Sequence, residues 1–260
     1  MKYIVQLSSI LFLGSIIFSS CAVFTKGYSE YRSAQRFHKK QEYHQAALYA
    51  SKSLKLNAKN KKALNLFERS YHLAIEDHES NISDLEKIED DSKWPRLYYE
   101  YDKLQNLSDE LISLKPIVNL ENENAPALLR YEMNLPNQDY HKELDRIGPL
   151  AAEYDYNKGL EYRKKKDKES QKIAAKAFKS AQQFVPNYKN SKELYNETRA
   201  SALLTLLILP FDGKNNLVNY IRDQMMMIQT NKPKEFLQII SRDQLSSTLL
   251  EQKLQLSGMV

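Results

Sequence analysis

Cysteine, glycine and proline are scarce in this chain of 260 residues, which contains one cysteine, six glycines and eight prolines. A lone cysteine excludes an internal disulfide, and with it a disulfide-stabilised scaffold. So little glycine and proline suits long helices joined by brief turns, and seventeen tyrosines are available to fill the space between those helices.

Motifs for catalysis and cofactor binding are also missing from the sequence. Gly213 follows an apolar run but lacks the further glycines and the lysine that cradle a phosphate. Ser257 precedes Gly258 without forming the Gly-x-Ser-x-Gly elbow of a hydrolase. The five histidines are nowhere three or four residues apart, so no helix face offers two of them to a metal. We therefore expect no catalytic residue, no metal, no cofactor and no enzymatic activity.

The charge balance is mildly basic, with 38 lysines and arginines against 33 acidic residues. Such a balance does not require nucleic acid as a partner, and we expect none. The densest basic run is Arg163-Lys164-Lys165-Lys166-Asp167-Lys168. A solvated end of a helix is the simplest interpretation, and contact with anionic headgroups or an acidic partner is the alternative.

The N-terminus has the layout of an export signal, with Lys2, an apolar stretch over residues 4–18 and two serines before Cys21. Its end, Phe18-Ser19-Ser20-Cys21, resembles the lipobox of bacterial lipoproteins. The resemblance implies a signal peptide over residues 1–20, acylation of Cys21, and an anchor and linker over residues 21–27. Two or three acyl chains hold a protein on a membrane where one chain is marginal. An uncleaved helix of about 18 residues is the main alternative.

Ala22 follows the cysteine, and no acidic run comes directly after it. In the lipoproteins that this leader resembles, such a start implies the bacterial outer membrane, with the body facing the periplasm. The lipid membrane is therefore one expected partner, bound through acylated Cys21.

A period of 34 residues predicts helical repeats in the first half of the chain, since Tyr71 follows Phe37 by that distance. One helix is expected up to a break near residues 40–42, and a second helix after it. The spacing resembles the tetratricopeptide repeat, with the first array over residues 28–117. The positions that carry this resemblance are Ala34, Phe37, Tyr43, Ala46, Ser53 and Tyr71.

A third apolar stripe begins after Ser92 and is expected to stop at Pro116. Residues 118–150 then predict either a linker or a degenerate repeat. A clear unit returns over residues 151–200, with a few inserted residues near 163–170 and a closing helix over 190–200. Its repeat positions are Gly159, Tyr162, Ala174, Phe178, Ala181 and Pro186. A generic helical bundle is the alternative to a repeat array.

The pattern changes at residue 203. Continuous apolar residues over 203–209 predict a strand buried on both faces, as in a parallel sheet. A helix over 217–228, a strand over 236–240 and a helix over 245–256 complete a strand-helix-strand-helix order. The segment after the second strand resembles the CsgG-like family of curli secretion channels and related lipoproteins. The residues that carry this resemblance are Arg242, Leu245, Glu251, Gln252, Ser257 and Gly258.

The family's domain contains further strands, so we expect the module over residues 203–260 to be incomplete. Truncation, evolutionary loss and completion by another chain are the three explanations left open, and the last would make an oligomer. An open strand edge favours completion by another chain.

These observations predict a mainly α protein: a tetratricopeptide-like array followed by a small α/β module. The expected function is a membrane-anchored periplasmic scaffold that binds a protein or peptide in the cell envelope. Its ligand face is expected to include Tyr31, Gln35 and Arg163. The alternatives are a component of a CsgG-like secretion or assembly apparatus and a regulator of a cell-envelope enzyme.

Overall fold

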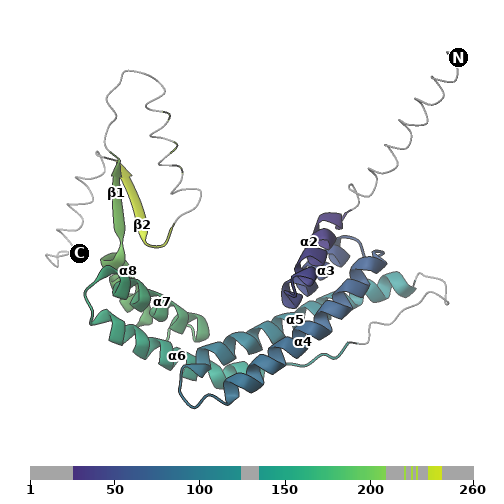
Figure 1. Cartoon of the computed structure of the whole chain (residues 1–260), viewed down its shortest axis with the longest axis horizontal. Coiled ribbons are helices and arrows are strands. Elements are labelled where there is room, and N and C mark those ends of the chain that lie inside the picture. Colours follow the sequence, from purple (N-terminus) through teal and green to yellow (C-terminus); the bar gives the residue numbers. More distant parts are fainter. Residues whose placement is uncertain are drawn as a thin grey trace. The chain divides into compact units, whose positions relative to one another are not determined.

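The computed structural model describes residues 26–123, 135–208, 220, 224, 227 and 234–241 (Figure 1). The described residues are mainly α-helical, as predicted: seven helices pack in sequence, and a two-stranded parallel sheet lies near the C-terminus. The chain divides into two compact units, Met1–Gly148 and Pro149–Val260. Helix α6 (His141–Arg163) crosses the division between them.

The first unit begins with the antiparallel pair α2 (Tyr28–Lys39) and α3 (Tyr43–Leu56). The predicted break between them is confirmed, and Gln41 adopts a positive φ of 63° in that turn. Gly27, with φ 81°, lies at the N-terminus of α2. A Cβ atom on Gly27 would lie 2.6 Å from the carbonyl oxygen of Ser53, and Ser53 Oγ donates a 2.7 Å hydrogen bond to Gly27 O. Glycine therefore allows the start of α2 to touch the end of α3.

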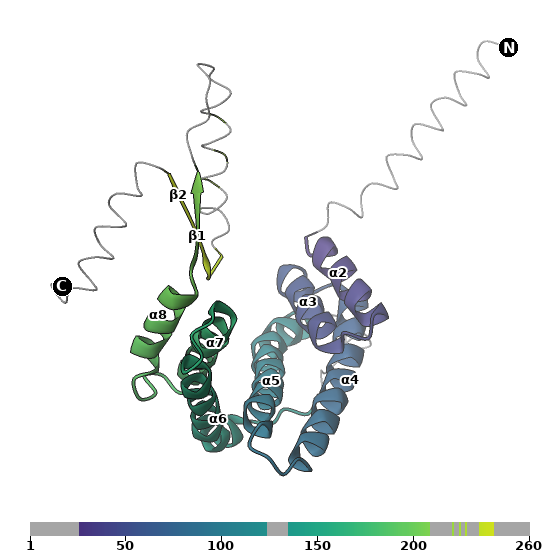
Figure 2. The same cartoon turned by 60° about the vertical axis from the view of Figure 1, so that its left-hand side comes forward.

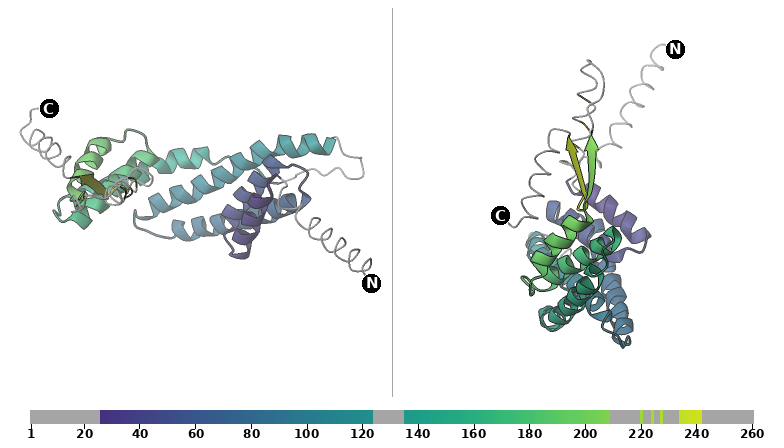
Figure 3. Two further views of the ribbon diagram at one scale, coloured as in Figure 1. Left: turned by 90° about the horizontal axis from the view of Figure 1, so that it is seen from above. Right: turned by 90° about the vertical axis from the view of Figure 1, so that its left-hand side faces the viewer.

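Two long helices complete most of this unit, α4 (Lys61–Glu86) and α5 (Lys93–Glu123). Asn60 caps α4 by accepting a 3.2 Å hydrogen bond from the Ala63 amide. Figures 2 and 3 show α4 and α5 side by side, with α2 and α3 packed next to them.

The prediction that the third helix stops at Pro116 is wrong, because α5 continues to Glu123. Proline keeps a helical φ and removes one backbone hydrogen bond, so burial further along can outweigh its cost. Val118, only 3% exposed, belongs to the same apolar core as Leu111 and Leu114. The next helix, α6, contains Pro149 within its length as well.

The first unit has two apolar clusters. One gathers around Phe67 and Tyr71 of α4, which are almost fully buried, and small alanines of α2 and α3 let the helices approach. The other joins Leu97 and Leu104 of α5 to Ile147 of α6. Residues in the predicted linker or degenerate repeat over 118–150 take part: Val118 and Leu135 in the first cluster, Tyr140 and Ile147 in the second.

The second unit contains the rest of α6 with α7 (Lys168–Phe184) and α8 (Ser191–Ala202). The predicted interruption near residues 163–170 is confirmed, since α6 ends at Arg163 and α7 starts at Lys168. Asp167 caps α7 by accepting a 2.9 Å hydrogen bond from the Ser170 amide. Helix α7 ends just before Pro186, as expected.

Strands β1 (Leu204–Ile208) and β2 (Leu237–Ser241) pair in parallel, with Leu206 opposite Ile239. Both strands were predicted, and Figure 3 shows them side by side. Of the helix predicted over 217–228, the structure describes residues 220, 224 and 227, which are helical. The helix predicted over 245–256 lies outside the described residues. The prediction that β1 is buried on both faces is wrong, because Leu204 is 55% exposed and Leu206 is 47% exposed. Within the described residues β1 pairs with β2 alone, and Thr205, which points to the opposite face from Leu204 and Leu206, is exposed as well.

Candidate binding site

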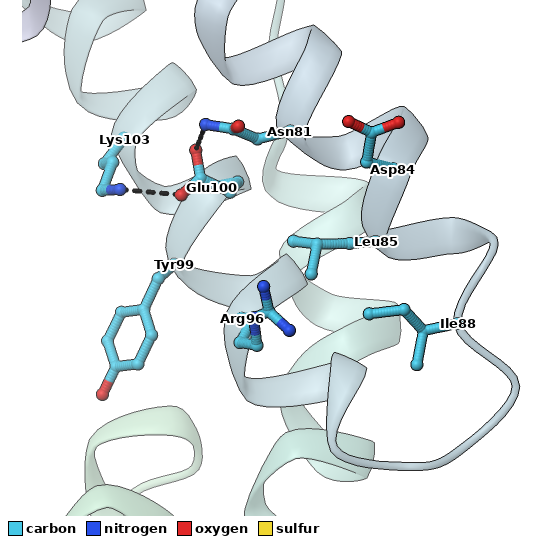
Figure 4. A pocket seen from close by; sticks show the side chains of 8 residues that line it. All are labelled: Asn81, Asp84, Leu85, Ile88, Arg96, Tyr99, Glu100 and Lys103. Atoms are coloured by element: carbon cyan, nitrogen blue, oxygen red, sulfur yellow. Dashed lines mark hydrogen bonds and ion pairs between the residues drawn. The ribbon is translucent and has the colours of Figure 1, made fainter.

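A pocket of about 600 Å³ lies between the C-terminal part of α4 and the N-terminal part of α5 (Figure 4). Leu85 and Ile88 point toward Arg96, and the ring of Tyr99 points away from them. Tyr99 is 42% exposed, whereas Leu85 is buried and Ile88 is half-buried, so Tyr99 is the apolar side chain of the pocket that is most open to solvent. The residues that line it are Asn81, Asp84, Leu85, Ile88, Arg96, Tyr99, Glu100 and Lys103.

Glu100 is the fixed polar group of this pocket. Its carboxylate accepts a 2.8 Å hydrogen bond from Lys103 Nζ, a 2.7 Å bond from His78 Nδ1 and a longer one of 3.3 Å from Asn81 Nδ2. Burial favours the neutral carboxyl, but the hydrogen bonds and positive charges of His78 and Lys103 outweigh it and lower the pKa of Glu100 to about 2. The carboxylate is therefore charged and held in place by α4 and α5.

Behind Glu100, a chain of polar side chains crosses three helices. His78 of α4 uses its Nδ1 on Glu100, and its Nε2 lies 3.1 Å from His44 Nδ1 on α3. Burial, followed by the positive charges of His78 and Lys103, lowers the pKa of His44 to about 4. His44 is thus neutral near neutral pH. This series of hydrogen-bonded side chains, from His44 through His78 to Glu100, ties α3, α4 and α5 together. Its polar groups would be costly to bury without partners.

Among the described residues, no group of three His, Cys, Asp or Glu side chains is arranged to hold a metal ion. Both ring nitrogens of His78 already have partners. His44 and His78 meet from separate helices, a contact that the spacing of histidines along each single helix did not reveal. Their separation is 34 residues, the same as that of Phe37 and Tyr71, so the repeat period was the signal that could have identified the pair.

The predicted repeat positions in the first unit serve packing. Ala34, Ala46 and Ser53 are fully buried, and Phe37 stacks on Tyr49 with ring centres 5.1 Å apart. Tyr43 packs against the first apolar cluster. Tyr71 is buried and its hydroxyl donates a 2.9 Å hydrogen bond to Pro136 O. These residues fix the positions of α2, α3 and α4.

The repeat positions in the second unit meet at one point. Phe178 of α7 packs against Gly159 and Tyr156 of α6, and Tyr162 lies beside the same cluster. Ala174 and Ala181 flank Phe178 on α7 and are fully buried.

Residues expected on a ligand face have partners within the chain. Gln35 donates a 2.8 Å hydrogen bond to the hydroxyl of Tyr31, one turn away on α2. Arg163 makes a two-pronged contact with Glu197 of α8, at 2.7 and 2.9 Å from its Nη2. Arg163 is therefore a link between α6 and α8, which the sequence did not predict.

Glu235 was also missed. Its carboxylate accepts from Lys179 Nζ at 2.9 Å and from the Tyr195 hydroxyl at 2.8 Å, and Arg199 Nε donates to its carbonyl oxygen at 3.0 Å. The segment that leads into β2 is thereby fastened to α7 and α8. No local pattern marks a lone glutamate as such a junction.

Two groups of predicted residues lie outside the described residues. One is Cys21 with the leader before it. The other is the set that resembles the CsgG-like family, namely Arg242, Leu245, Glu251, Gln252, Ser257 and Gly258. Among the helices that are described, each is too short or too polar to cross a bilayer.

Comparison with known proteins finds no family, no curated protein and no solved structure that matches this chain.

Proposed function

We propose that this chain is a membrane-anchored lipoprotein whose helices serve as a scaffold for another protein of the cell envelope. In this proposal the described helices form tetratricopeptide-like arrays over residues 28–117 and 151–200. Acylated Cys21 holds the body on the periplasmic face of the outer membrane, and the module over 203–260 is CsgG-like.

One observation carries the proposal: side chains that are 34 residues apart repeatedly meet. His44 lies 3.1 Å from His78, Tyr156 donates a 2.7 Å hydrogen bond to Asn190, and Arg163 pairs with Glu197. A shared offset in both units is what stacked repeats of one length produce, because each repeat contacts its neighbour in the same register. Repeats stacked in this way offer extended surfaces to partners.

The pocket between α4 and α5 is the proposed contact point for a partner segment. It offers the exposed ring of Tyr99 on one side and the side chains of Leu85 and Ile88 on the other, together with the polar groups of Glu100 and Lys103. Aromatic and aliphatic side chains beside a polar rim are typical of protein interfaces. Because Glu100 is already fixed by α4 and α5, binding there would require little ordering of the protein.

The anchor adds to this function by confinement. A lipid-anchored protein and a partner on the same membrane face meet at a raised effective concentration, so a modest contact suffices. Cys21 as the acylation site rests on the leader sequence.

A second candidate is a component of a CsgG-like secretion or assembly apparatus. The parallel pairing of β1 with β2 favours it, as does the exposure of Leu204 and Leu206 on β1. An uncovered strand can pair with a neighbouring subunit. Under this candidate the chain purified from membranes would form a ring-sized oligomer, whereas a scaffold would be recovered with a different protein.

The test uses the full chain in its native membrane with a photo-crosslinking residue in place of Tyr99. The control places the same residue at Ile112, which is 52% exposed on α5 but does not line the pocket. A discrete adduct at position 99 and none at position 112 is expected, and its identity distinguishes a secretion component or a cell-wall enzyme from other partners. An acylated, folded chain that yields no adduct at position 99 would contradict the proposed contact point.

A further inference from the structure

The turn between α6 and α7 and the residue on either side of it, together residues 163–168, form the densest basic run of the chain. It contains five basic residues and only Asp167 of opposite sign. Lys164, Lys165 and Lys166 at its centre are all exposed. We refer to these three lysines as the lysine tip.

The backbone beneath the lysine tip is fixed by buried groups. Gln171 of α7 is only 5% exposed, and its Nε2 donates to the carbonyl oxygens of Arg163, at 3.0 Å, and Lys165. Asp167 accepts from the Ser170 amide and so begins α7. The tip is therefore presented by an ordered turn, and binding through it would not require the loop to be ordered first.

The charges at the two ends of the loop are used within the protein. Arg163 pairs with Glu197, and Lys168 Nζ donates a 3.2 Å hydrogen bond to the carbonyl oxygen of Leu203. Among the described residues, none of the three tip lysines has an ion pair. Lys165 lies over the ring of Tyr162, 4.4 Å from its centre, which leaves its charge exposed. Three cations are thus available to an anionic surface.

We propose that the lysine tip binds anionic phospholipid headgroups of the membrane that carries the chain. This inference rests on the proposed function, since acylated Cys21 would keep the tip near that membrane. Lysine ammonium groups are hydrated point charges that suit phosphates of varied geometry. The loop offers no large apolar side chain of the kind a protein interface uses. Each lysine near an anionic surface strengthens binding about fivefold at low salt.

The first experiment measures amine acetylation, lysine by lysine, on the acylated chain in vesicles. One set contains only phosphatidylcholine, and the other contains about a third phosphatidylglycerol. At low salt we expect acetylation of Lys164, Lys165 and Lys166 to slow about tenfold or more in the anionic vesicles, and high salt to restore it. Three exposed lysines of the first unit serve as internal controls, and each should be acetylated at the same rate in the two sets of vesicles: Lys39, Lys61 and Lys62.

Equal rates at the tip in both vesicles would overturn the proposal. Protection by added polyglutamate, without protection by phosphatidylglycerol, would overturn it in favour of an acidic protein partner.

The second experiment separates the tip from the anchor. The full chain carrying Cys21→Ser, which cannot be acylated, is compared with the same chain that also carries Lys164→Gln, Lys165→Gln and Lys166→Gln. The tip variant should bind phosphatidylglycerol vesicles roughly 10- to 100-fold more weakly at low salt. The matched control carries Lys39→Gln, Lys61→Gln and Lys62→Gln and should bind as the parent does.

Equal binding of the tip variant and its control would contradict the role of the tip. A purified native chain without acyl mass on Cys21 would instead contradict the proposed anchor, while tip binding could still be measured with the Cys21→Ser chain.

Discussion

Gly159 of α6 and Phe178 of α7 are packed against each other so closely that no side chain fits between them. A Cβ atom on Gly159 would lie 2.6 Å from Cε1 of Phe178 and 2.8 Å from two other ring atoms. Phe178 is fully buried, with Ala174 and Ala181 on either side of it. The ring therefore has little space into which it could move, and the glycine sets the distance between α6 and α7.

Replacing this glycine by alanine should destabilise the second unit. In Gly159→Ala the added methyl overlaps the Phe178 ring, and overpacking of this kind costs about 1–3 kcal/mol. Alanine recovers up to about 1 kcal/mol through its higher helix propensity, so we expect a net loss of about 1–2 kcal/mol. Urea unfolding followed by circular dichroism measures it.

The double variant Gly159→Ala/Phe178→Leu tests the cause. Leucine has no ring at the site of overlap, so the cost of Gly159→Ala should be smaller in the Phe178→Leu background. Equal costs in both backgrounds would show that the two residues do not interact as described.

The pKa of His44 predicts how stability depends on pH. Its folded pKa of about 4 lies below the ordinary 6.5, so the unfolded chain binds that proton more readily. The free energy of unfolding should fall as the pH drops from about 6.5 to about 4. His44→Gln removes this contribution. The free energy of unfolding that is lost between pH 7 and pH 5 should then be smaller by about 1–2 kcal/mol, a value kept low because the ring is partly exposed and solvent screens its charge. His72→Gln, an exposed site on α4, is the control and should leave the loss unchanged.

Glu100 acts in a lower pH range. Its folded pKa of about 2 lies below the ordinary 4.5, so its contribution to stability is complete above about pH 4.5 and disappears toward pH 2. Loss of stability below pH 4.5 should therefore remain in His44→Gln. A variant in which both losses disappear would contradict the separate assignment of the two groups.

Pro116 offers a test of the continuous α5. Because it lies inside a helix and lacks the backbone N–H, Pro116→Ala should raise the free energy of unfolding by about 1–3 kcal/mol. Pro95 lies in the first turn of α5, where the N–H has no helical partner, so Pro95→Ala should gain less. Thermal unfolding compares them. If Pro116→Ala has no effect or destabilises the chain, α5 is interrupted near this residue.

Removal of the Glu235 carboxylate should release the segment before β2. In Glu235→Ala the contacts with Lys179 and Tyr195 are lost, whereas the Arg199 bond to the backbone carbonyl remains. Hydrogen exchange of the amides in β2 should become faster while exchange in α7 is unchanged, because local opening follows the loss of local contacts. Glu193→Ala, on the exposed surface of α8, should leave β2 exchange as it is. Unchanged exchange in Glu235→Ala would show that Glu235 does not hold the strand.

The helices were predictable where apolar residues recur with a helical period between clear stops. The start of α7 near Ser170, its end before Pro186 and the close of the chain of helices at α8 followed from such patterns. Pro116 misled the prediction, because a proline stops a helix only where burial beyond it is too small, and the burial of Val118 depends on other helices. The exposure of β1 was missed because an apolar run does not reveal whether another layer covers it.

The candidate site was harder to predict. Leu85 and Ile88 are ordinary apolar residues in the sequence, and Glu100 is one acidic residue among 33 aspartates and glutamates. Their roles depend on α4 and α5 lying side by side.

The sequence alone determined the helical class, the 34-residue offset and most helix ends, because these depend on local propensity and on which residues face a common core. Tertiary structure alone decided that His44, His78 and Glu100 form one polar chain. It also decided that Arg163 pairs with Glu197 and that Glu235 joins three partners. Such contacts bring together side chains from separate helices, and their positions follow from the packing of the whole unit rather than from any one segment.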